Sequence, residues 1–107
     1  MSGGFGDMGK MMKQVQKMQS EMAKLQEELA ERTVEATAGG GVVKVVVNGR
    51  HEIKEIQIDP EVIDPEEPEL LEDLVLAAVN EAMKEAQDMI SEEMSKITGG
   101  MKLPGMP

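Results

Sequence analysis

The sequence predicts an α+β fold in which a long helix, three antiparallel strands and a second long helix follow one another. Three observations support this order: a heptad pattern of apolar residues early in the chain, a β-branched run between turn signals, and a late amphipathic pattern. The chain has 107 residues, the size of one domain. We expect a single domain over residues 8–98, with flexible segments at residues 1–7 and 99–107.

The first helix is predicted over residues 8–31, because seven apolar residues recur there at alternating spacings of three and four. Good helix formers, mainly Gln, Lys, Glu and Ala, lie between them. A helix of this length would measure about 36 Å. It must therefore project from so small a protein or lie along an equally long partner. The seven residues are Met8, Met11, Val15, Met18, Met22, Leu25 and Leu29.

Three strands are predicted next, over residues 33–38, 42–47 and 51–58. Residues 42–47 include five valines and are the strongest candidate, because β-branched side chains favour extended backbone. That strand is apolar on both faces, so we expect it to be covered on both sides or buried in a sheet shared by two chains. Pairing with a second copy would also protect an apolar edge from aggregation. The residues expected at this dimer interface are Val42, Val43, Val45, Val46, Val47, Ile53 and Ile56.

The turn signals indicate how these strands connect. Three glycines at residues 39–41 predict a flexible turn, and Asn48-Gly49 predicts a tight hairpin whose two central residues adopt positive φ. The apolar positions Ile53 and Ile56 break strict alternation. A β-bulge is therefore expected near Lys54–Glu55.

The second helix is predicted from Pro68 to about residue 98, with the glycines at 99 and 100 ending it. An acidic stretch leads into it: residues 59–73 hold eight acidic side chains and no basic one. Carboxylates favour the positive end of a helix. The spacing of an EF-hand calcium loop is missing, so we interpret this stretch as a solubilising, helix-capping segment.

The composition argues against several classes of protein. Cysteine is absent, so we expect neither disulfides nor thiolate metal sites, and a cytoplasmic location. No apolar run is long enough to span a membrane. His51, the only histidine, has no second ligand near it in sequence and is expected to be an exposed turn residue. Since no nucleophile, phosphate-loop or zinc motif occurs, we expect no enzyme, no metal and no cofactor.

Charge is distributed unevenly along the chain, whose net charge is −10. Residues 1–24 contain four lysines and two acidic residues, whereas the remainder contains seven basic and nineteen acidic residues. The four lysines fall on the helix face opposite the apolar residues. Such a face either keeps a long helix soluble or contacts the phosphates of a nucleic acid, which requires no base-specific group.

Segments in order along nearly the whole chain resemble the YbaB/EbfC family of bacterial nucleoid-associated proteins. The matching segments are KMMKQVQKMQ (residues 10–19), VNG (47–49) leading to IDP (58–60), LEDLVLAAVNEA (71–82) and GMKLPG (100–105). The resemblance implies a homodimer whose hairpins join into a common sheet and whose long helices project as a pair of arms. It also implies binding and bending or compaction of double-stranded DNA in the nucleoid, and a part in gene regulation.

The same resemblance implies where DNA would be contacted, because basic residues of the two long helices are implicated in the family. Carried over by position, the implied DNA-binding residues are Lys10, Lys13, Lys17 and Lys24 on the first helix and Lys84 and Lys96 on the second.

The methionines leave a second interpretation open. Methionine occurs 11 times, and its flexible thioether side chain adapts to varied apolar partners. Long helical arms with methionine-rich inner faces could grip client segments, as a prefoldin-like holdase does. That function would tolerate loss of the lysines and would be sensitive to Met18→Glu or Met22→Glu in a client aggregation assay.

Overall fold

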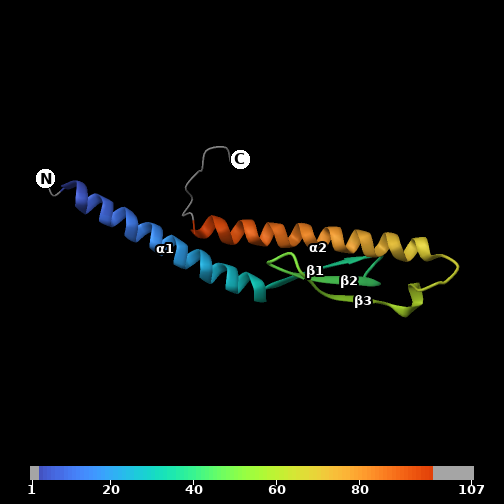
Figure 1. Cartoon of the computed structure of the whole chain (residues 1–107). Coiled ribbons are helices and arrows are strands. Elements are labelled where there is room, and N and C mark those ends of the chain that lie inside the picture. Colours follow the sequence, from blue (N-terminus) through green and yellow to red (C-terminus); the bar gives the residue numbers. More distant parts are fainter. Residues whose placement is uncertain (1–2, 98–107) are drawn as a thin grey trace.

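The computed structural model describes residues 3–97, with side chains from residue 8 onward. Its elements are α1 (Gly3–Glu31), β1 (Thr33–Ala38), β2 (Val43–Asn48), β3 (Ile53–Ile58), the 3-10 turn η1 (Pro60–Val62) and α2 (Pro68–Ile97). The molecule is elongated: α2 lies along the sheet, and α1 extends beyond the sheet at one end (Figure 1). The predicted order of helix, three strands and helix is confirmed.

The strands form one antiparallel sheet in the order β1-β2-β3. β1 and β2 pair without interruption. Between β2 and β3 the register shifts, because Val46 pairs with Glu55 whereas the next residue, Val47, pairs with Ile53. Lys54 is therefore an extra residue in β3, and the β-bulge predicted there is confirmed.

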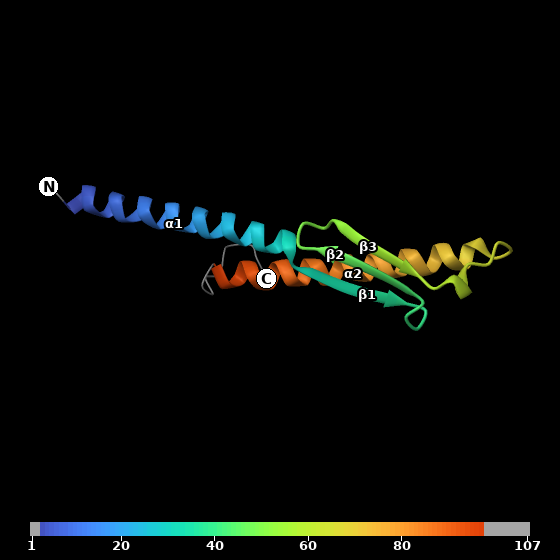
Figure 2. The same ribbon diagram turned by 90° about the horizontal axis from the view of Figure 1, so that it is seen from below.

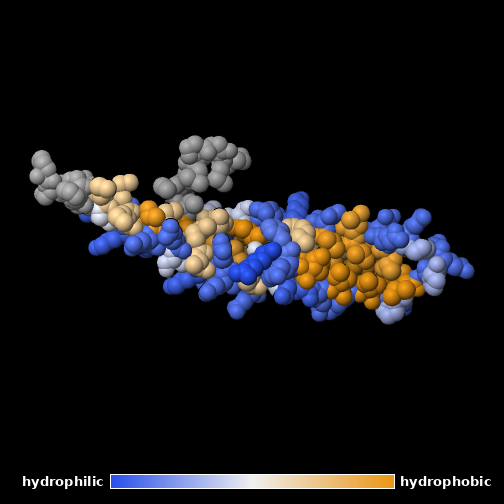
Figure 3. Space-filling view, in the orientation of Figure 1, coloured by the Kyte–Doolittle hydropathy of each residue, from blue (hydrophilic) through white to orange (hydrophobic). Residues whose placement is uncertain are grey.

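α2 packs on one face of the sheet, over β1 and β2, and lies behind the strands when the molecule is seen from below (Figure 2). Ala78, Ala82 and Ala86 of α2 are fully buried in one cluster with Val43 and Val45 of β2. Because alanine has no side chain beyond Cβ, the helix approaches the sheet closely along this row. An apolar patch remains visible beside α2 in the space-filling view (Figure 3).

α1 contacts the rest of the molecule only through its last turns among the residues described. Leu25 and Leu29 are buried in a second cluster with Met89 of α2. Toward its N-terminus, α1 extends past the end of α2 and becomes a projecting arm (Figure 1).

The N-terminal boundary of α1 differs from the prediction. The helix begins at Gly3, inside the segment 1–7 that was expected to be flexible, rather than at Met8. Glycine disfavours helix by about 1 kcal/mol, but extending an existing helix needs no new nucleus. The predicted segment 99–107, with the glycines expected to end α2, lies outside the described residues.

The turn between β2 and β3 also differs from the predicted two-residue hairpin. The carbonyl of Asn48 accepts a hydrogen bond from the His51 amide, and the Asn48 amide donates to the Glu52 carbonyl. Gly49, Arg50 and His51 therefore form a three-residue loop. Positive φ occurs at His51, at 59°, and not at Asn48 or Gly49, so the prediction of positive φ at the Asn48-Gly49 pair is wrong.

The reason is that this turn is packed against the end of α1. The buried Asn48 side chain donates hydrogen bonds to the Ala30 carbonyl at 3.0 Å and to the Glu52 carboxylate at 2.8 Å, while its oxygen accepts two loop amides. The Gly49 amide donates to the Leu29 carbonyl at 2.7 Å. A Cβ on Gly49 would lie 2.5 Å from that oxygen, so the glycine is required by close approach.

Gly49→Ala should therefore lower the free energy of unfolding by about 1–3 kcal/mol, because a methyl group is forced against the backbone of α1. Gly9→Ala is the matched control, since nothing lies within 4 Å of the Cβ it would add. That change should raise stability by about 0.5–1 kcal/mol. Urea unfolding followed by far-UV circular dichroism, at equal protein concentration, measures both; equal stabilities would contradict the close contact.

Candidate nucleic-acid interface

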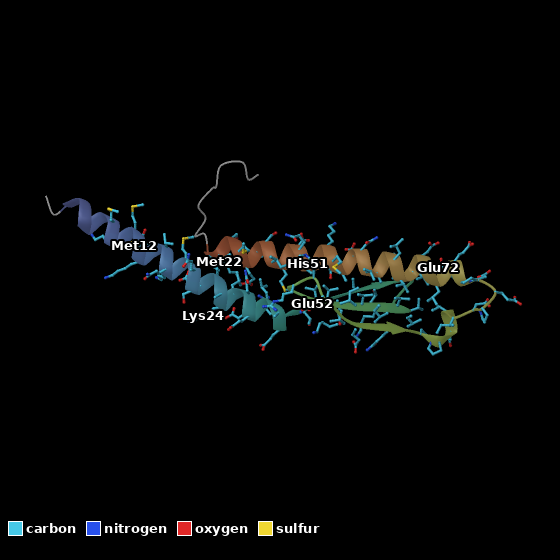
Figure 4. The ribbon with its side chains drawn as sticks, viewed as in Figure 1. Met12, Met22, Lys24, His51, Glu52 and Glu72 are labelled. Atoms are coloured by element: carbon cyan, nitrogen blue, oxygen red, sulfur yellow. The ribbon has the colours of Figure 1, made fainter. Side chains whose placement is uncertain are left out.

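Four lysines of α1 form a row that we name the lysine ridge. At 3.6 residues per turn they fall within about 60° of the helix circumference and span about 21 Å along its axis. All four side chains are exposed. In Figure 4, Lys24 lies on the side of α1 away from Met22. The lysine ridge consists of Lys10, Lys13, Lys17 and Lys24.

The charges of the lysine ridge are not neutralised by the part of the chain that the structure describes. Across residues 8–97, no ridge lysine takes part in an ion pair. The paired lysines are elsewhere: Lys44 Nζ lies 3.6 Å from a Glu35 oxygen, and Lys96 Nζ lies 3.1 Å from a Glu93 oxygen. The ridge ammonium groups are thus available to an external anion such as a phosphate.

The two lysines predicted on α2 occupy different surroundings. Lys96, in the last turn, lines a shallow depression between the two helices together with Lys24. Lys84 is exposed about 18 Å further along α2, on the face opposite the buried row of Ala78, Ala82 and Ala86. The structure therefore brings Lys96 to the ridge and leaves Lys84 apart from it.

Glu93 connects α1 and α2 beside this depression. Its carboxylate accepts hydrogen bonds from the Arg32 guanidinium, just after α1, and from the Lys96 ammonium. These two cations hold the pKa of the Glu93 carboxyl below its usual value, with Arg32 contributing most. The sequence analysis missed this trio because Arg32 and Glu93 are 61 residues apart, and no local spacing relates them.

The opposite face of α1 is apolar and uncovered over most of its length. We name this row the methionine seam. These residues are not part of the core of one chain, because α2 ends before it reaches them and only the last turns of α1 are buried. The methionine seam consists of Met8, Met11, Val15 and Met18, which are 63%, 65%, 53% and 40% exposed.

The valines predicted at the dimer interface divide into two groups. Val43, Val45 and Val47 have no exposed surface, because α2 covers them within the same chain. Val42 and Val46 are half-buried. The first three therefore belong to the core of one chain.

The isoleucines predicted at the same interface do lie on an open surface. Ile53 and Ile56 of β3 are opposite Val47 and Val45 of β2, so they share the sheet face that carries α2. The helix packs on β1 and β2 rather than on β3, and both isoleucines remain 44% exposed. β3 is also an edge strand, with unpaired backbone groups along its outer side.

Other candidate chemistry is limited. His51 is exposed in the β2–β3 turn, as predicted. Within the described part of the chain, no three His, Asp or Glu side chains are grouped to hold a metal ion. No helix in that part is both long and apolar enough to cross a lipid bilayer.

Comparison with known proteins extends over almost the whole chain. A sequence model of the YbaB/EbfC DNA-binding family matches residues 4–101. A nucleoid-associated protein of Pelotomaculum thermopropionicum is 66% identical over 101 residues, 94% of this chain and 96% of the relative. A nucleoid-associated protein of Moorella thermoacetica is 64% identical over 102 residues, 95% of this chain and 98% of the relative.

The fold is also found in a solved structure. The crystal structure of an uncharacterized protein from Helicobacter pylori matches 88% of this chain and 96% of its own, with a TM-score of 0.73 at 23% identity. The matched family is a DNA-binding one with nucleoid-associated relatives, and not an enzyme family. With a match that includes nearly all of α1, the whole sheet and α2, the chain belongs to the YbaB/EbfC DNA-binding family.

Proposed function

We propose that the protein is a homodimer in the cytoplasmic nucleoid that binds duplex DNA mainly through its sugar–phosphate backbone. The lysine ridge carries this proposal, because it presents four exposed lysines, unpaired within residues 8–97, on an arm clear of the sheet. Ammonium groups in a row neutralise phosphates without reading base edges. Lys96, which is paired with Glu93, lies next to this surface and extends it, whereas Lys84 lies on a different face and takes no part.

The net charge of −10 does not oppose this contact, because the densest acidic segment lies far from the ridge. Residues 59–73 connect β3 to α2 and form its first turns, at the end of the molecule opposite the arm (Figure 1). The molecule is 80 Å long, and the Debye length at physiological salt is about 8 Å. The field at the ridge is therefore set by nearby residues.

Those nearby residues include glutamates as well as lysines. Glu21, Glu27 and Glu28 lie on the same helix, beside or beyond the C-terminal part of the ridge. They reduce the local positive potential without cancelling it, since the ridge continues three further turns toward the N-terminus. Binding through such a surface is weak and strongly dependent on salt.

Two copies pair through β3 in this proposal. The edge strand supplies free backbone groups, and Ile53 and Ile56 supply apolar surface next to it. A two-fold contact covers this surface on both copies at once and doubles the ridge to two arms. A dimer that holds DNA at two places alters the path of the duplex between them, which supports a role in nucleoid organisation and gene regulation.

The exposed methionine seam favours a second candidate function, a holdase that grips apolar client segments. The two functions depend on opposite faces of α1. Suppression of client aggregation that is lost in Met18→Glu and kept in Lys17→Glu would support the holdase. The reverse pattern, with loss of DNA binding only in Lys17→Glu, would support the leading proposal.

Replacing Lys10, Lys13 and Lys17 together by Glu should abolish DNA binding, because the ridge then repels phosphates. The measurement is fluorescence anisotropy of a labelled, mixed-sequence duplex at low and physiological salt. For the unchanged protein, about four neutralised phosphates per dimer give a slope of log affinity against log salt of about −4. Unaltered binding by the folded triple variant would show that the ridge is not the contact surface.

A matched pair of single changes separates the ridge from the rest of the surface. Lys17→Glu should weaken binding and reduce the salt slope by at least about one. Lys84→Glu is the control, an identical change at an exposed lysine on the outer face of α2, and it should leave the affinity unchanged. Equal effects of the two changes would refute a ridge-specific contact.

Ile56→Glu should convert the dimer to a monomer, because it places a charge in the apolar surface of β3. Gln57→Glu is the matched control. Gln57 pairs with Lys44 on the polar face of the sheet, so the dimer should persist in this variant. Sedimentation equilibrium measures both, and circular dichroism checks that both variants fold. A dimeric Ile56→Glu protein would exclude the β3 interface.

A further inference from the structure

The methionine seam is used neither by the fold nor by the proposed DNA contact. It faces away from the lysine ridge, and α2 ends too early to cover it. The proposed contact between copies involves β3, beside α2, and leaves the arm uncovered. A row of large apolar side chains this exposed indicates a surface that another segment occupies.

We propose that residues 98–107 of the same chain continue past the end of α2 and pack along the methionine seam. These residues follow α2 directly and read TGGMKLPGMP. They contain three large apolar side chains, Met101, Leu103 and Met106, and no acidic residue. The segment thus has the chemistry needed to cover an apolar helix face.

The described part of α2 ends near the C-terminal end of the methionine seam. Ile97 packs on the cluster that contains Leu25 of α1. The next surface along α1 toward its N-terminus is a shallow groove lined by Val15, Met18 and Met22. Figures 1 and 2 both show α2 ending beside the middle of α1 and running toward the N-terminal end of that helix. A chain that continues in this direction follows the seam.

The spacing of the apolar residues in segment 98–107 also matches the spacing of the methionine seam. An extended chain advances about 3.3 Å per residue, so Met101 and Leu103 lie about 6–7 Å apart. Neighbouring seam residues are three or four helix positions apart, or about 4.5–6 Å. From Ile97 to Met106 the chain can span about 30 Å. That reach exceeds the roughly 26 Å along α1 between Leu25 and Met8.

The remaining residues of the segment suit this path. Glycine at 99 and 100 permits the backbone conformations that a change of direction needs. Pro104 favours an extended backbone, as the match of spacings requires. Because the segment is tethered to α2, its effective concentration at the seam is of the millimolar order. A separate copy at micromolar concentration competes poorly with it, and the ridge on the far side stays free for DNA.

The chain has no cysteine, so Pro107→Cys offers a unique site for a nitroxide spin label. In protein with ¹³C-methyl methionine, the label should broaden the Met8 and Met11 signals and spare Met83, which packs over the sheet. In a mixture of labelled unenriched chains and unlabelled enriched chains, no broadening is expected. Broadening in that mixture would place the segment on a second copy, and its absence in both samples would leave the seam uncovered; either result overturns the proposal.

Substitutions test the same contact without a label. Leu103→Glu should reduce hydrogen-exchange protection of residues 8–18 several-fold, whereas Lys102→Gln, which changes the charge by the same amount, should not. Val15→Glu should have the effect of Leu103→Glu, and the double variant should lose no more than either alone. Full protection in Leu103→Glu, or additive losses in the double variant, would refute the contact.

Discussion

The buried side chain of Asn48 holds the arm to the sheet, and the direction of α1 depends on it. A helix end leaves four carbonyl groups without partners, and here one of them is satisfied by the Asn48 amide and another by the neighbouring Gly49 amide. The amide group of Asn48 makes two donated and two accepted hydrogen bonds, which is its full capacity. The same residue therefore closes the β-turn and ends the helix.

The second constraint is the width of α2. A helix is about 10 Å across and strands are about 4.8 Å apart, so one helix covers about two strands of a sheet. α2 covers β1 and β2, with a row of alanines that allows close contact. The third strand keeps its apolar face but has no helix above it. The core of one chain is therefore left open on the β3 side. The cause is the width of a single helix and not the number of apolar residues in the chain.

The sequence predicted what depends on local periodicity and missed what depends on distant contacts. The bulge at Lys54 was predictable because it interrupts the alternation of Ile53 and Ile56. The ridge was predictable as a helix face, although its use in DNA binding stays a proposal. The turn at Asn48-Gly49 was predicted wrongly because these two residues are typical of a tight hairpin, whereas here contacts with α1 determine the turn. Burial of the central valines and exposure of the methionine seam both depend on where α2 lies, which no pattern in the chain specifies.

The way α1 is attached makes it a lever. The helix is anchored at Leu25, Leu29 and the Asn48 turn, and its Met8 end lies about 32 Å from Leu29. A rotation of about 10° at the anchor moves that end by about 6 Å, while the packing of α2 on the sheet need not change. The lysines nearest the tip therefore travel furthest for a given rotation. In the proposed dimer, two such levers on a rigid sheet could match the separation of their lysine rows to the spacing of phosphates on the nucleic acid, and only a few contacts at the base of each helix would change.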